Sequence, residues 1–539
     1  MINTPMLGKA SQHHVILAGL TLAIIAINRA QGQDETAVAS GNPVVGAEVL
    51  QVPGVKDLGR RGSSTPVEVV VTLRFNHADE LHRLVHQQSD PSSPNYHWYV
   101  TLAEFAERFG PTTEQVDRVN SELQKAGFQV TETSTNRLLI HATAPSGIVE
   151  NYFKTEIHTV DQGEDGEAYM NVKPALLPDA LVPFVKSVHV DNLVVAKVGV
   201  HRDSITGPIQ GPDGGYTPVA VSDSFDFPVR HSHDGSGHTA AIIIDSDVGD
   251  SDLGSFFSFF SITRSGTITR ESVNGGQIGI IKTGPSADEC ALDTETIGGL
   301  APGANIIIYI IPQLSTTAIN DAANTIVSED TAEAVNMSFG GSEFKDPTFE
   351  SALLEGNAEG ITFVASSGDI GSAGGASWPA VEPHVLALGG TVITYSNGVY
   401  VHNEAWSGSG GAVSKVFSIP SYQKGFSRLA SKTKRNVPDV AFPAYYTDTF
   451  IGGRFVGLEG TSWSSPIYVA LQVEINEAKG SRFGWVNPNI YRVFRSSGYT
   501  DFYDVTNGSN GKYKAKVGYD NVTGIGSPIG EALATDPNF

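Results

Sequence analysis

The chain of 539 residues is too long for one ordinary hydrophobic core, so its length predicts two folded units together with processing segments. Hydrophobic residues make up 40% of the chain and charged residues only 17%, which excludes a largely disordered protein. The formal net charge of −23 argues against nucleic acid as a partner and favours a protein that tolerates acid, because a carboxylate-rich surface loses its self-repulsion as the pH falls.

The N-terminal region has the features of an export signal. Lys9 precedes an apolar run at 15–27, which has the length of a signal-peptide core and is too short to span a bilayer. We therefore predict a signal peptide at 1–33, a disordered lead at 34–46, and a protein that is secreted to the extracellular space and leaves the membrane once the signal is removed. A retained anchor is the alternative, because 26–33 lacks a clear small-x-small cleavage pattern.

Residues 47–197 have the pattern of a first folded domain. Runs of β-branched and aromatic residues predict strands, and apolar residues at helical spacing predict helices between them. Because the helices cross between strands that we expect to be antiparallel, the order is typical of a ferredoxin-like α+β unit. The predicted strands are 67–75, 128–133 and 137–142, with further strands up to about 195, and the predicted helices are 78–87, 102–109, 113–126 and 146–153.

The segment 198–217 is rich in Gly, Pro, Ser and Asp and has no apolar periodicity, which indicates an exposed linker. We expect the activation cleavage to fall in this linker. Residues 218–539 then alternate short apolar strands with helical stretches, as is typical of a parallel sheet wrapped by helices. The predicted strands of this α/β domain are 239–245, 305–311, 334–338 and 361–366.

The most specific motif is G-T-S-W-S-S-P at 460–466, just before a helical run at 467–478. A serine at the start of a helix faces free backbone N–H groups and the positive end of the helix dipole, and both stabilise a developing negative charge. Ser462 is therefore a candidate nucleophile. The alternative is a serine that only caps the helix.

A serine nucleophile needs a base that takes its proton. Glu289 and Asp293 are four residues apart in a segment with a helical pattern, so both carboxylates project from one face and can touch. Two touching carboxylates do not both ionise easily; they share a proton, and one becomes a base with a raised pKa. A solvated acidic helix face is the alternative, but the scarcity of charge and the apolar, Gly-rich continuation favour a buried pair.

The third candidate is Asp369, which ends an S-G-D sequence at 367–369 directly after a predicted strand. Loops at the C-terminal ends of parallel strands are where α/β active sites assemble. A neutral aspartic acid in such a loop can donate a hydrogen bond to an oxyanion. The alternative role for Asp369 is that of a turn residue.

These motifs together resemble the sedolisin family of serine-carboxyl peptidases, in particular its kumamolisin-like members. Three signatures occur in the family's order: E-x-x-x-D at 289–293 leading into L-A-P-G-A, S-G-D at 367–369, and G-T-S-x-x-x-P at 460–466. The segment D-P-S-S-P-N-Y at 90–96 is similar to part of the family's propeptide. The resemblance spans about residues 47–535.

The resemblance implies a subtilisin-like catalytic domain at 218–539, preceded by an inhibitory propeptide domain at 47–197 and a linker at 198–217 that carries the activation cut. We therefore predict a zymogen that processes itself. Its expected partners are protein and peptide substrates and its own propeptide, and we expect a monomer.

The resemblance also implies a role for each candidate residue. Ser462 would be the nucleophile, Glu289 its base, Asp293 the partner that orients Glu289, and Asp369 the oxyanion donor. A carboxylate base and a protonated carboxyl donor coexist only in acid, since model carboxyl groups titrate near about pH 4. We predict an acid-active endopeptidase; release of tripeptides is the alternative, because pocket shape decides between the two and no sequence spacing reports it.

Three other classes are weaker alternatives. A subtilisin-type enzyme needs a His-Gly-Thr motif, which none of the 15 histidines provides, although Asp245 resembles the aspartate of subtilisin's strand. A pepsin-like protease needs two Asp-Thr/Ser-Gly loops, and the sequence after Asp245 is not one. A peptide-binding pseudoenzyme would lack a catalytic residue, whereas all four are present. Many family members carry Glu at the position of Asp245 and Trp at that of Phe339, so the resemblance leaves the outer hydrogen-bond network open.

Two segments near the C-terminus, F-Y-D-V-T at 502–506 and G-Y-D-N-V-T-G-I-G at 518–526, resemble the family's calcium loop. Carboxylates combined with backbone carbonyls suit the hard cation Ca²⁺. The resemblance implies one structural calcium ion per chain, although paired aspartates at such a separation also occur as loop caps. The implied ligands are the side chains of Asp504 and Asp520 and the carbonyl groups of Val505, Lys516 and Gly518, with Lys516 in place of the usual glycine.

Overall fold

The computed structural model describes residues 43–202, 215–396 and 399–539. The signal peptide predicted at 1–33 lies outside these residues, as do most of the predicted lead and most of the predicted linker. Residues Val45–Phe539 form one compact unit. No helix within the described ranges has the length and apolar character needed to cross a membrane.

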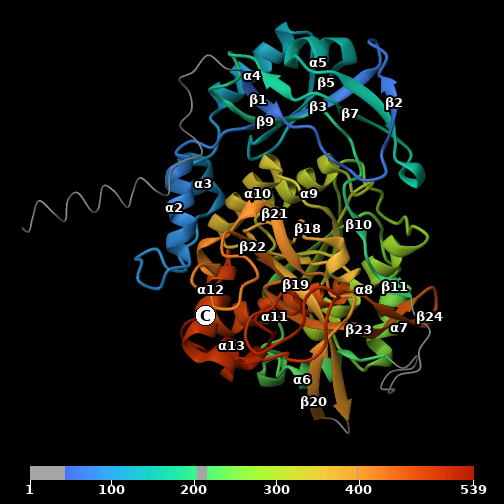
Figure 1. Ribbon diagram of the computed structural model, residues 1–539, viewed down its shortest axis with the longest axis vertical. Helices are drawn as coiled ribbons and strands as arrows, with labels where there is room; N and C mark the ends of the chain where they lie inside the picture. Colours follow the sequence, from blue (N-terminus) through green and yellow to red (C-terminus); the bar gives the residue numbers. More distant parts are fainter. Residues whose placement is uncertain (1–42, 203–214, 397–398) are drawn as a thin grey trace, which may run out of the picture. The chain divides into compact units, whose positions relative to one another are not determined.

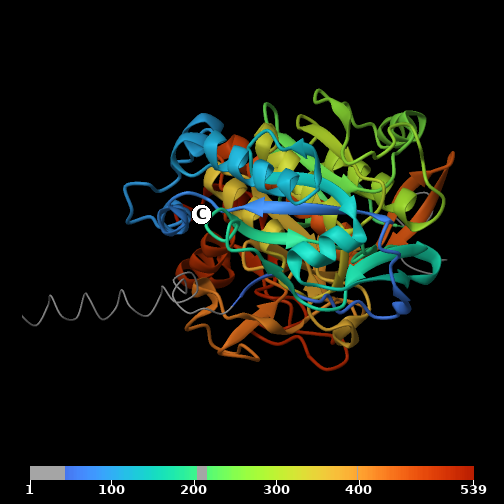
Figure 2. The same ribbon diagram turned by 90° about the horizontal axis from the view of Figure 1, so that it is seen from above.

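The N-terminal domain contains a four-stranded antiparallel sheet in the order β4-β5-β3-β9. Three helices, of which α4 is the last, lie between β3 and β4, and α5 lies between β5 and β9. With α4 and α5 as its two helices, the chain follows the β-α-β-β-α-β path of a ferredoxin-like unit. The prediction of a ferredoxin-like α+β domain is confirmed, and Figures 1 and 2 show its strands in blue to teal. The elements are β3 (Pro66–Leu73), α4 (Thr113–Lys125), β4 (Gln129–Thr133), β5 (Leu139–Pro145), α5 (Ser146–Phe153) and β9 (Val185–His189).

The remaining elements of this domain begin where the local sequence directs them. The Thr101 hydroxyl accepts the backbone N–H of Glu104, and the Glu104 side chain accepts the backbone N–H of Thr101, so this capping box sets the start of α3. Thr112 and Gln115 do the same for α4. The other elements are β1 (Val44–Ala47), β2 (Lys56–Arg60), α2 (Ala78–Gln88), α3 (Leu102–Arg108), β6 (Ile157–Asp161), β7 (Glu167–Asn171) and β8 (Ala175–Leu177).

The C-terminal domain is built on a ten-stranded sheet, as far as the described residues show it. Its central strands run parallel in the order β19-β17-β15-β12-β14-β13, and β23 extends the parallel run beyond β19. β20, β24 and β11 add antiparallel pairs at one side. The strands are β11 (His201–Arg202), β12 (Thr239–Ile244), β13 (Ile268–Ser272), β14 (Asn305–Ile310), β15 (Ala334–Met337), β17 (Thr362–Ser366), β19 (Val385–Ser396), β20 (Val399–Ala405), β23 (Val440–Ile451) and β24 (Arg454–Glu459).

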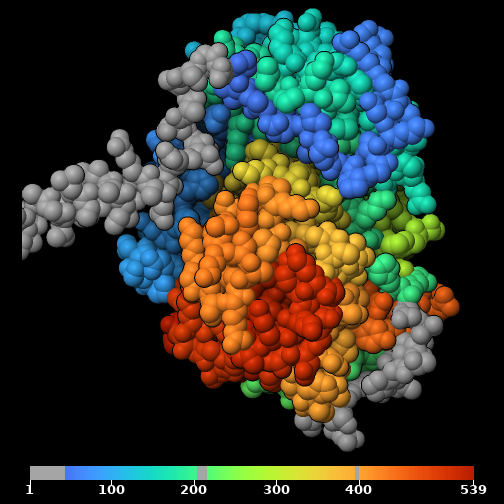
Figure 3. Space-filling view, in the orientation of Figure 1, coloured from blue at the N-terminus to red at the C-terminus, as the bar shows by residue number. Residues whose placement is uncertain are grey.

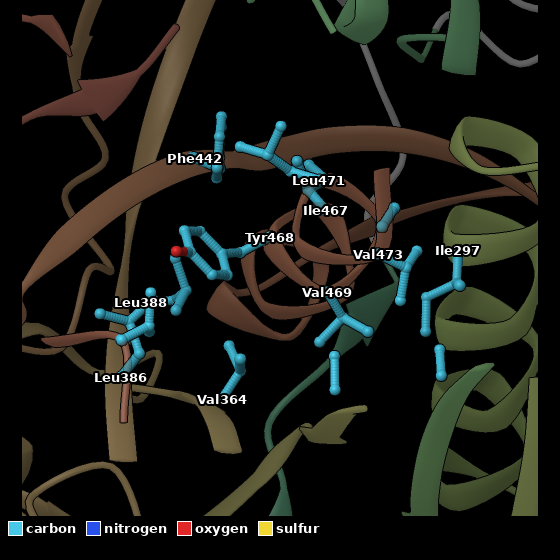
Figure 4. Close-up of a cluster of buried hydrophobic side chains, with 14 of the residues drawn as sticks. Ile297, Val364, Leu386, Leu388, Phe442, Ile467, Tyr468, Val469, Leu471 and Val473 are labelled. Atoms are coloured by element: carbon cyan, nitrogen blue, oxygen red, sulfur yellow. The ribbon is translucent and has the colours of Figure 1, made fainter. Parts of the chain in front are cut away.

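Helices cover both faces of this sheet, as the alternation of strand side chains requires. Ile242 belongs to the core that contains α8 (Pro285–Leu300) and α11 (Thr461–Lys479). The next residue, Ile243, belongs to the core that contains α9 (Thr316–Glu329) and α10 (Pro347–Glu359). Figure 4 shows the first core, in which the apolar side of α11, including Val469, faces Val364 and Leu386 of the sheet. The predicted parallel α/β domain is confirmed.

Helices alternate with the strands of the C-terminal domain, as predicted. They are α6 (Pro218–Ser224), α7 (Asp250–Phe259), α8 (Pro285–Leu300), α9 (Thr316–Glu329), α10 (Pro347–Glu359), α11 (Thr461–Lys479), α12 (Asn487–Ser497) and α13 (Gly530–Thr535). Short strands form small separate sheets: β10 (Lys197–Val198), β16 (Phe339–Ser342), β18 (Ser377–Trp378), β21 (Ala412–Ser418), β22 (Lys434–Val437), β25 (Phe502–Tyr503) and β26 (Ser527–Pro528).

The two domains contact each other through α2 and β9 of the first and α10 of the second. The Gln88 side chain donates a hydrogen bond to the Ala358 carbonyl at 2.8 Å. The His189 ring nitrogen Nε2 lies 3.1 Å from Asp346 Oδ1, and both side chains are buried. The interface between the two domains therefore contains hydrogen-bonded and ionic contacts in addition to apolar ones.

Candidate active site

Glu289 and Asp293 lie four residues apart on α8, and both are fully buried. Burial raises the pKa of each carboxyl well above its usual range, and the neighbouring Asp293 raises the pKa of Glu289 further. The Ser462 hydroxyl and the backbone N–H of Val200 act on Glu289 in the opposite direction. The structure thus brings together the pair that the spacing predicted, in a buried setting that raises the pKa of both carboxyls.

Asp293 is held from its other side by β15 and the residue that follows it. The Ser338 hydroxyl donates a hydrogen bond to Asp293 Oδ1 at 2.8 Å. The Asn336 amide in turn donates to Ser338 Oγ at 2.9 Å, and both residues are fully buried. These two successive hydrogen bonds fix the orientation of Asp293. In contrast, neither Glu289 oxygen has a hydrogen-bond partner of normal geometry among the described side chains.

Ser462 is the second residue of α11, so this helix begins six residues before the predicted run at 467–478. Gly460 precedes the helix with a φ of 149°, a backbone conformation that favours glycine. Ser462 is only 1% exposed, and its Oγ lies 3.5 Å from the Ser338 carbonyl. Pro466 has no N–H to offer the Ser462 carbonyl, which instead lies 3.2 Å from the Ser338 hydroxyl.

Asp369 follows β17, in the loop that Gly368 turns with a φ of 108°. Its Oδ1 accepts hydrogen bonds from the backbone N–H and the hydroxyl of Thr461, both at 2.6 Å. Burial raises the pKa of Asp369 to about 6, even though these bonds from Thr461 stabilise the ionised form. The second oxygen, Oδ2, lies close to the residue that precedes α11, since a Cβ added to Gly460 would be 2.9 Å from it.

The four predicted residues converge, and three other residues join them. Asp293, Ser462 and Asp369 each influence the ionisation of Glu289, so the carboxyls gather around the serine. Sequence reasoning missed Asn336, Ser338 and Thr461 as parts of the site. Thr461 stands in the serine motif and Ser338 directly follows a predicted strand, but their hydrogen-bond partners are far away in the sequence and gave no local signal.

The residues at the two positions that depart from the family pattern lie outside this network. Lys282 Nζ lies 2.6 Å from Asp245 Oδ2, and no ion pair joins Asp245 to a histidine in the part of the chain that the structure describes. Phe339 is fully buried in the core next to α9 and α10. Asp245 therefore has no part in a subtilisin-type triad here, and Ser338 supplies the outer support of the carboxylate pair.

The predicted calcium ligands provide a donor set that fits a hard cation. Asp504 Oδ1 is buried without a hydrogen-bond partner, and burial raises the pKa of Asp504 and brings that of Asp520 to about 6. The Lys516 ammonium donates to the Arg428 carbonyl at 3.3 Å, so it leaves the loop interior free. No group of three or more His, Cys, Asp or Glu side chains within the described ranges could hold a metal, so an ion here needs carbonyl ligands as well. Figure 3 shows this C-terminal region in red on the surface.

Comparison with known proteins agrees with the fold. Residues 53–193 match the family described as "Pro-kumamolisin, activation domain", and residues 275–488 match the "Subtilase family". Kumamolisin from Bacillus sp. (strain MN-32) is 28% identical over 527 residues, which cover 90% of this chain and 94% of the relative. Sedolisin from Pseudomonas sp. (strain 101) is 30% identical over 511 residues, which cover 85% of each chain.

One solved structure extends this similarity to three dimensions. It is described as Pseudomonas sedolisin (serine-carboxyl proteinase) complexed with two molecules of pseudo-iodotyrostatin. It matches with a TM-score of 0.53 and 26% identity, over 59% of this chain and 97% of that chain.

A mostly parallel sheet with helices on both faces, and a serine at a helix start beside buried carboxyls, define a serine-type peptidase of subtilisin-like fold. The chain belongs to the sedolisin family, and it carries an activation domain ahead of the catalytic domain. The matched activation domain lies within the range 47–197 that we predicted for the propeptide.

Proposed function

We propose that this protein is a secreted, acid-active serine-carboxyl endopeptidase that cuts peptide bonds through an acyl-enzyme on Ser462. One observation carries the proposal: a buried pair of carboxyls, Glu289 and Asp293, lies beside a serine at the N-terminus of α11. Buried carboxyls whose pKa is strongly raised are found mainly at functional sites. Acid–base catalysis on the adjacent hydroxyl is the use that the geometry supports.

Each proposed role follows from a contact. Ser462 Oγ attacks the carbonyl carbon of the scissile bond while Glu289 accepts the hydroxyl proton. The C–N bond then breaks, and Glu289 returns the proton to the leaving amine. Water repeats the sequence in reverse to release the acid and restore the serine. Asp293, held by Ser338, shares the proton and charge of Glu289 during these transfers.

Asp369 is proposed to stabilise the oxyanion as a neutral acid. Its Oδ1 is already engaged by Thr461, so a proton on Oδ2 points toward the reacting carbonyl. Because the pKa of Asp369 is about 6, the neutral form dominates only below that pH. This requirement is the physical basis for the proposed acid optimum.

The proposed zymogen explains the N-terminal domain. The chain leaves this domain at β9 and continues through the catalytic site before it enters the catalytic domain, so the site accommodates chain on both sides of Ser462. Access from both directions supports endopeptidase action over release of tripeptides. Self-processing would free the same site for protein and peptide substrates.

We further propose one structural calcium ion, held by the side chains of Asp504 and Asp520 and by three carbonyl groups, those of Val505, Lys516 and Gly518. The buried, unpartnered Asp504 Oδ1 supports this assignment. Secretion to the extracellular space as a monomer remains part of the proposal. N-terminal sequencing of protein from the culture medium, together with its mass in solution, tests that part.

The catalytic assignment is tested with substitutions at Ser462 on α11 and Glu289 on α8, and with a matched control on α8. Ser462→Ala and Glu289→Gln should each lower the rate of digestion of a denatured protein in acid by about 10³-fold or more. Glu295→Gln is the control, because Glu295 is also buried on α8 but accepts a hydrogen bond from the Phe450 backbone instead of facing Ser462. It should keep most of the activity. Digestion by the Glu289→Gln protein at the unaltered rate refutes the proposal.

A further inference from the structure

The chain between the two domains crosses the catalytic site as an extended strand. β10 pairs antiparallel with β16 on one side of the site, and β11 pairs antiparallel with β24 on the other. Peptide substrates are commonly held in this way, by backbone pairing to an exposed strand. The register places Lys197 opposite Gly340, Val198 opposite Phe339, His201 opposite Glu459 and Arg202 opposite Leu458.

Gly199 and Val200 bridge the two pairings and meet the catalytic residues. A Cβ on Gly199 would lie 2.2 Å from Asp369 Oδ2, so only a glycine lets the backbone approach that carboxyl so closely. The backbone N–H of Val200 faces Glu289 and favours its ionised form, which lowers the pKa of Glu289. Val200 is only 4% exposed, so the prediction of an exposed linker was wrong at this residue.

Beyond Val200, the Arg202 side chain has a specific partner. Its Nε lies 2.6 Å from Asp288 Oδ2 and its Nη2 lies 2.5 Å from Asp288 Oδ1. This is a two-point guanidinium–carboxylate contact, the strongest and most directional ion pair available to proteins. Asp288 is 5% exposed and directly precedes Glu289, so a recognition group stands beside the proposed base.

We propose that residues 197–202 are bound as the enzyme's first substrate, that Gly199–Val200 is the bond cut first, and that Asp288 is a subsite for a basic side chain three residues after the cut. The proposal rests on the proposed function, since it uses Ser462 and Glu289 in their assigned roles. It extends to other substrates, because a peptide that replaces residues 197–202 would place its own third residue against Asp288.

The chemistry of the first cut matches these contacts. Ser462 Oγ bonds to the Gly199 carbonyl carbon, and its proton passes to Glu289. The Gly199–Val200 bond then breaks, and the proton moves from Glu289 to the Val200 nitrogen, the atom whose N–H favours the ionised form of Glu289 in the precursor. Water releases the Gly199 carboxyl group from Ser462.

The site of the first cut is tested on the full precursor. The protein is brought to acid pH, quenched at short times and analysed by mass spectrometry for new termini. We expect Val200 as the first new N-terminus in the unaltered chain and no such terminus in Ser462→Ala. A first cut at another bond overturns the assignment of Gly199–Val200. A precursor that makes no cut in acid, or a Ser462→Ala chain that cuts itself equally fast, contradicts the proposed function instead.

The subsite is tested with enzyme matured until the precursor has disappeared. Quenched-fluorescence peptides carry the sequence of residues 195–204 with Arg, Gln or Glu in the place of Arg202. We expect kcat/KM to be about tenfold higher for the Arg peptide than for the Gln peptide, and lower again for the Glu peptide. In Asp288→Asn the ratio of Arg to Gln should fall to within about twofold.

Asp250→Asn is the charge control for this measurement. It removes one negative charge from an exposed carboxylate at the start of α7, and it should keep the tenfold preference. Equal kcat/KM for all three peptides, or an unchanged preference in Asp288→Asn, overturns the subsite. The ratio of kcat/KM values tests the subsite, whatever the absolute rate of cleavage is. If all three peptides are cut equally and the cleavage depends on Ser462, the subsite is wrong but the proposed function stands.

Discussion

Ser338 Oγ donates a hydrogen bond to Asp293 Oδ1 at 2.8 Å, across 45 positions of sequence. The same hydroxyl accepts a bond from Asn336 and lies 3.2 Å from the carbonyl oxygen of Ser462. Ser338 therefore connects the carboxyl pair to the backbone of the proposed nucleophile. The family resemblance left the outer support of this pair open, and in this chain Ser338 provides it.

Ser338→Ala should lower kcat about 10- to 100-fold with a small change in KM, because a hydrogen bond to a charged group contributes about 1.5–3 kcal/mol. Loss of the bond also raises the pKa of Asp293, since Ser338 stabilises its ionised form. The measurement is the pH profile of kcat. Ser351→Ala is the control and should leave the profile in place, because this buried serine on α10 donates to the Pro347 carbonyl and accepts a hydrogen bond from Lys186 of the propeptide domain. An unchanged kcat in Ser338→Ala contradicts the assignment.

Asp369→Asn should flatten the fall of activity above about pH 6. In the unaltered enzyme, burial raises the pKa of Asp369 to about 6, so the neutral donor is present below that pH and disappears as the pH rises through it. An asparagine keeps its Oδ1 for Thr461 and offers an amide donor at every pH. We expect a lower maximum but no loss near pH 6, as read from kcat/KM between pH 3 and 8. The same midpoint in the variant and in the Asp250→Asn control would contradict the role of Asp369.

Asp346→Asn should release the propeptide domain at a milder pH. Burial opposes ionisation of Asp346, but protonated His189 and its hydrogen bond hold the pKa of Asp346 below its usual 3.8. Its contribution to docking is thus present above pH 3.8 and lost as the pH falls below it. Removing one partner of a buried ion pair costs about 3–5 kcal/mol, so the precursor should disappear at least about tenfold faster at pH 5.

The control for this variant crosses the same interface. Lys186 and Glu350 form an exposed pair at 3.3 Å, and Glu350→Gln should change the maturation rate less than about threefold. The pKa of His189 shifts in the opposite direction, so the pH dependence of its contribution to docking is also opposite. Burial lowers its pKa, but Asp346 and Asp191 raise the value to about 10, so its contribution is complete below pH 6.5 and lost only as the pH rises through about 10. Equal maturation rates for Asp346→Asn and Glu350→Gln would exclude this pair as the acid-sensitive contact.

Removal of calcium should lower the Tm of the matured enzyme by about 5 °C at pH 7, since a ligand at a hundred times its Kd stabilises by about 2.7 kcal/mol. Metal binding requires ionised carboxyls, and the pKa of Asp520 is raised to about 6, so the effect of a chelator should shrink at pH 4. Asp504→Asn should be insensitive to chelator, whereas Asp250→Asn should respond as the unaltered enzyme does. Identical Tm values with and without chelator at pH 7, together with no bound calcium by elemental analysis, would exclude the site.

The sequence alone determined the features that depend on neighbours along the chain. Glu289 and Asp293 share a helix face because their separation of four residues matches the helical repeat. The alternation of apolar strands and helices determined the α/β class in the same way. The motif also placed Ser462 at the start of a helix, and α11 begins at Thr461, six residues before the apolar run at 467–478.

Only the tertiary structure decided which distant groups meet in the site. The bond from Ser338 to Asp293, the approach of Gly199 to Asp369 and the contact of Arg202 with Asp288 each join residues that are tens of positions or more apart. Periodicity reports which side of an element is buried, but not which side chain of another element lies against it. That choice depends on how the whole sheet and its helices pack, because each of these contacts forms only after the intervening chain has closed its loop.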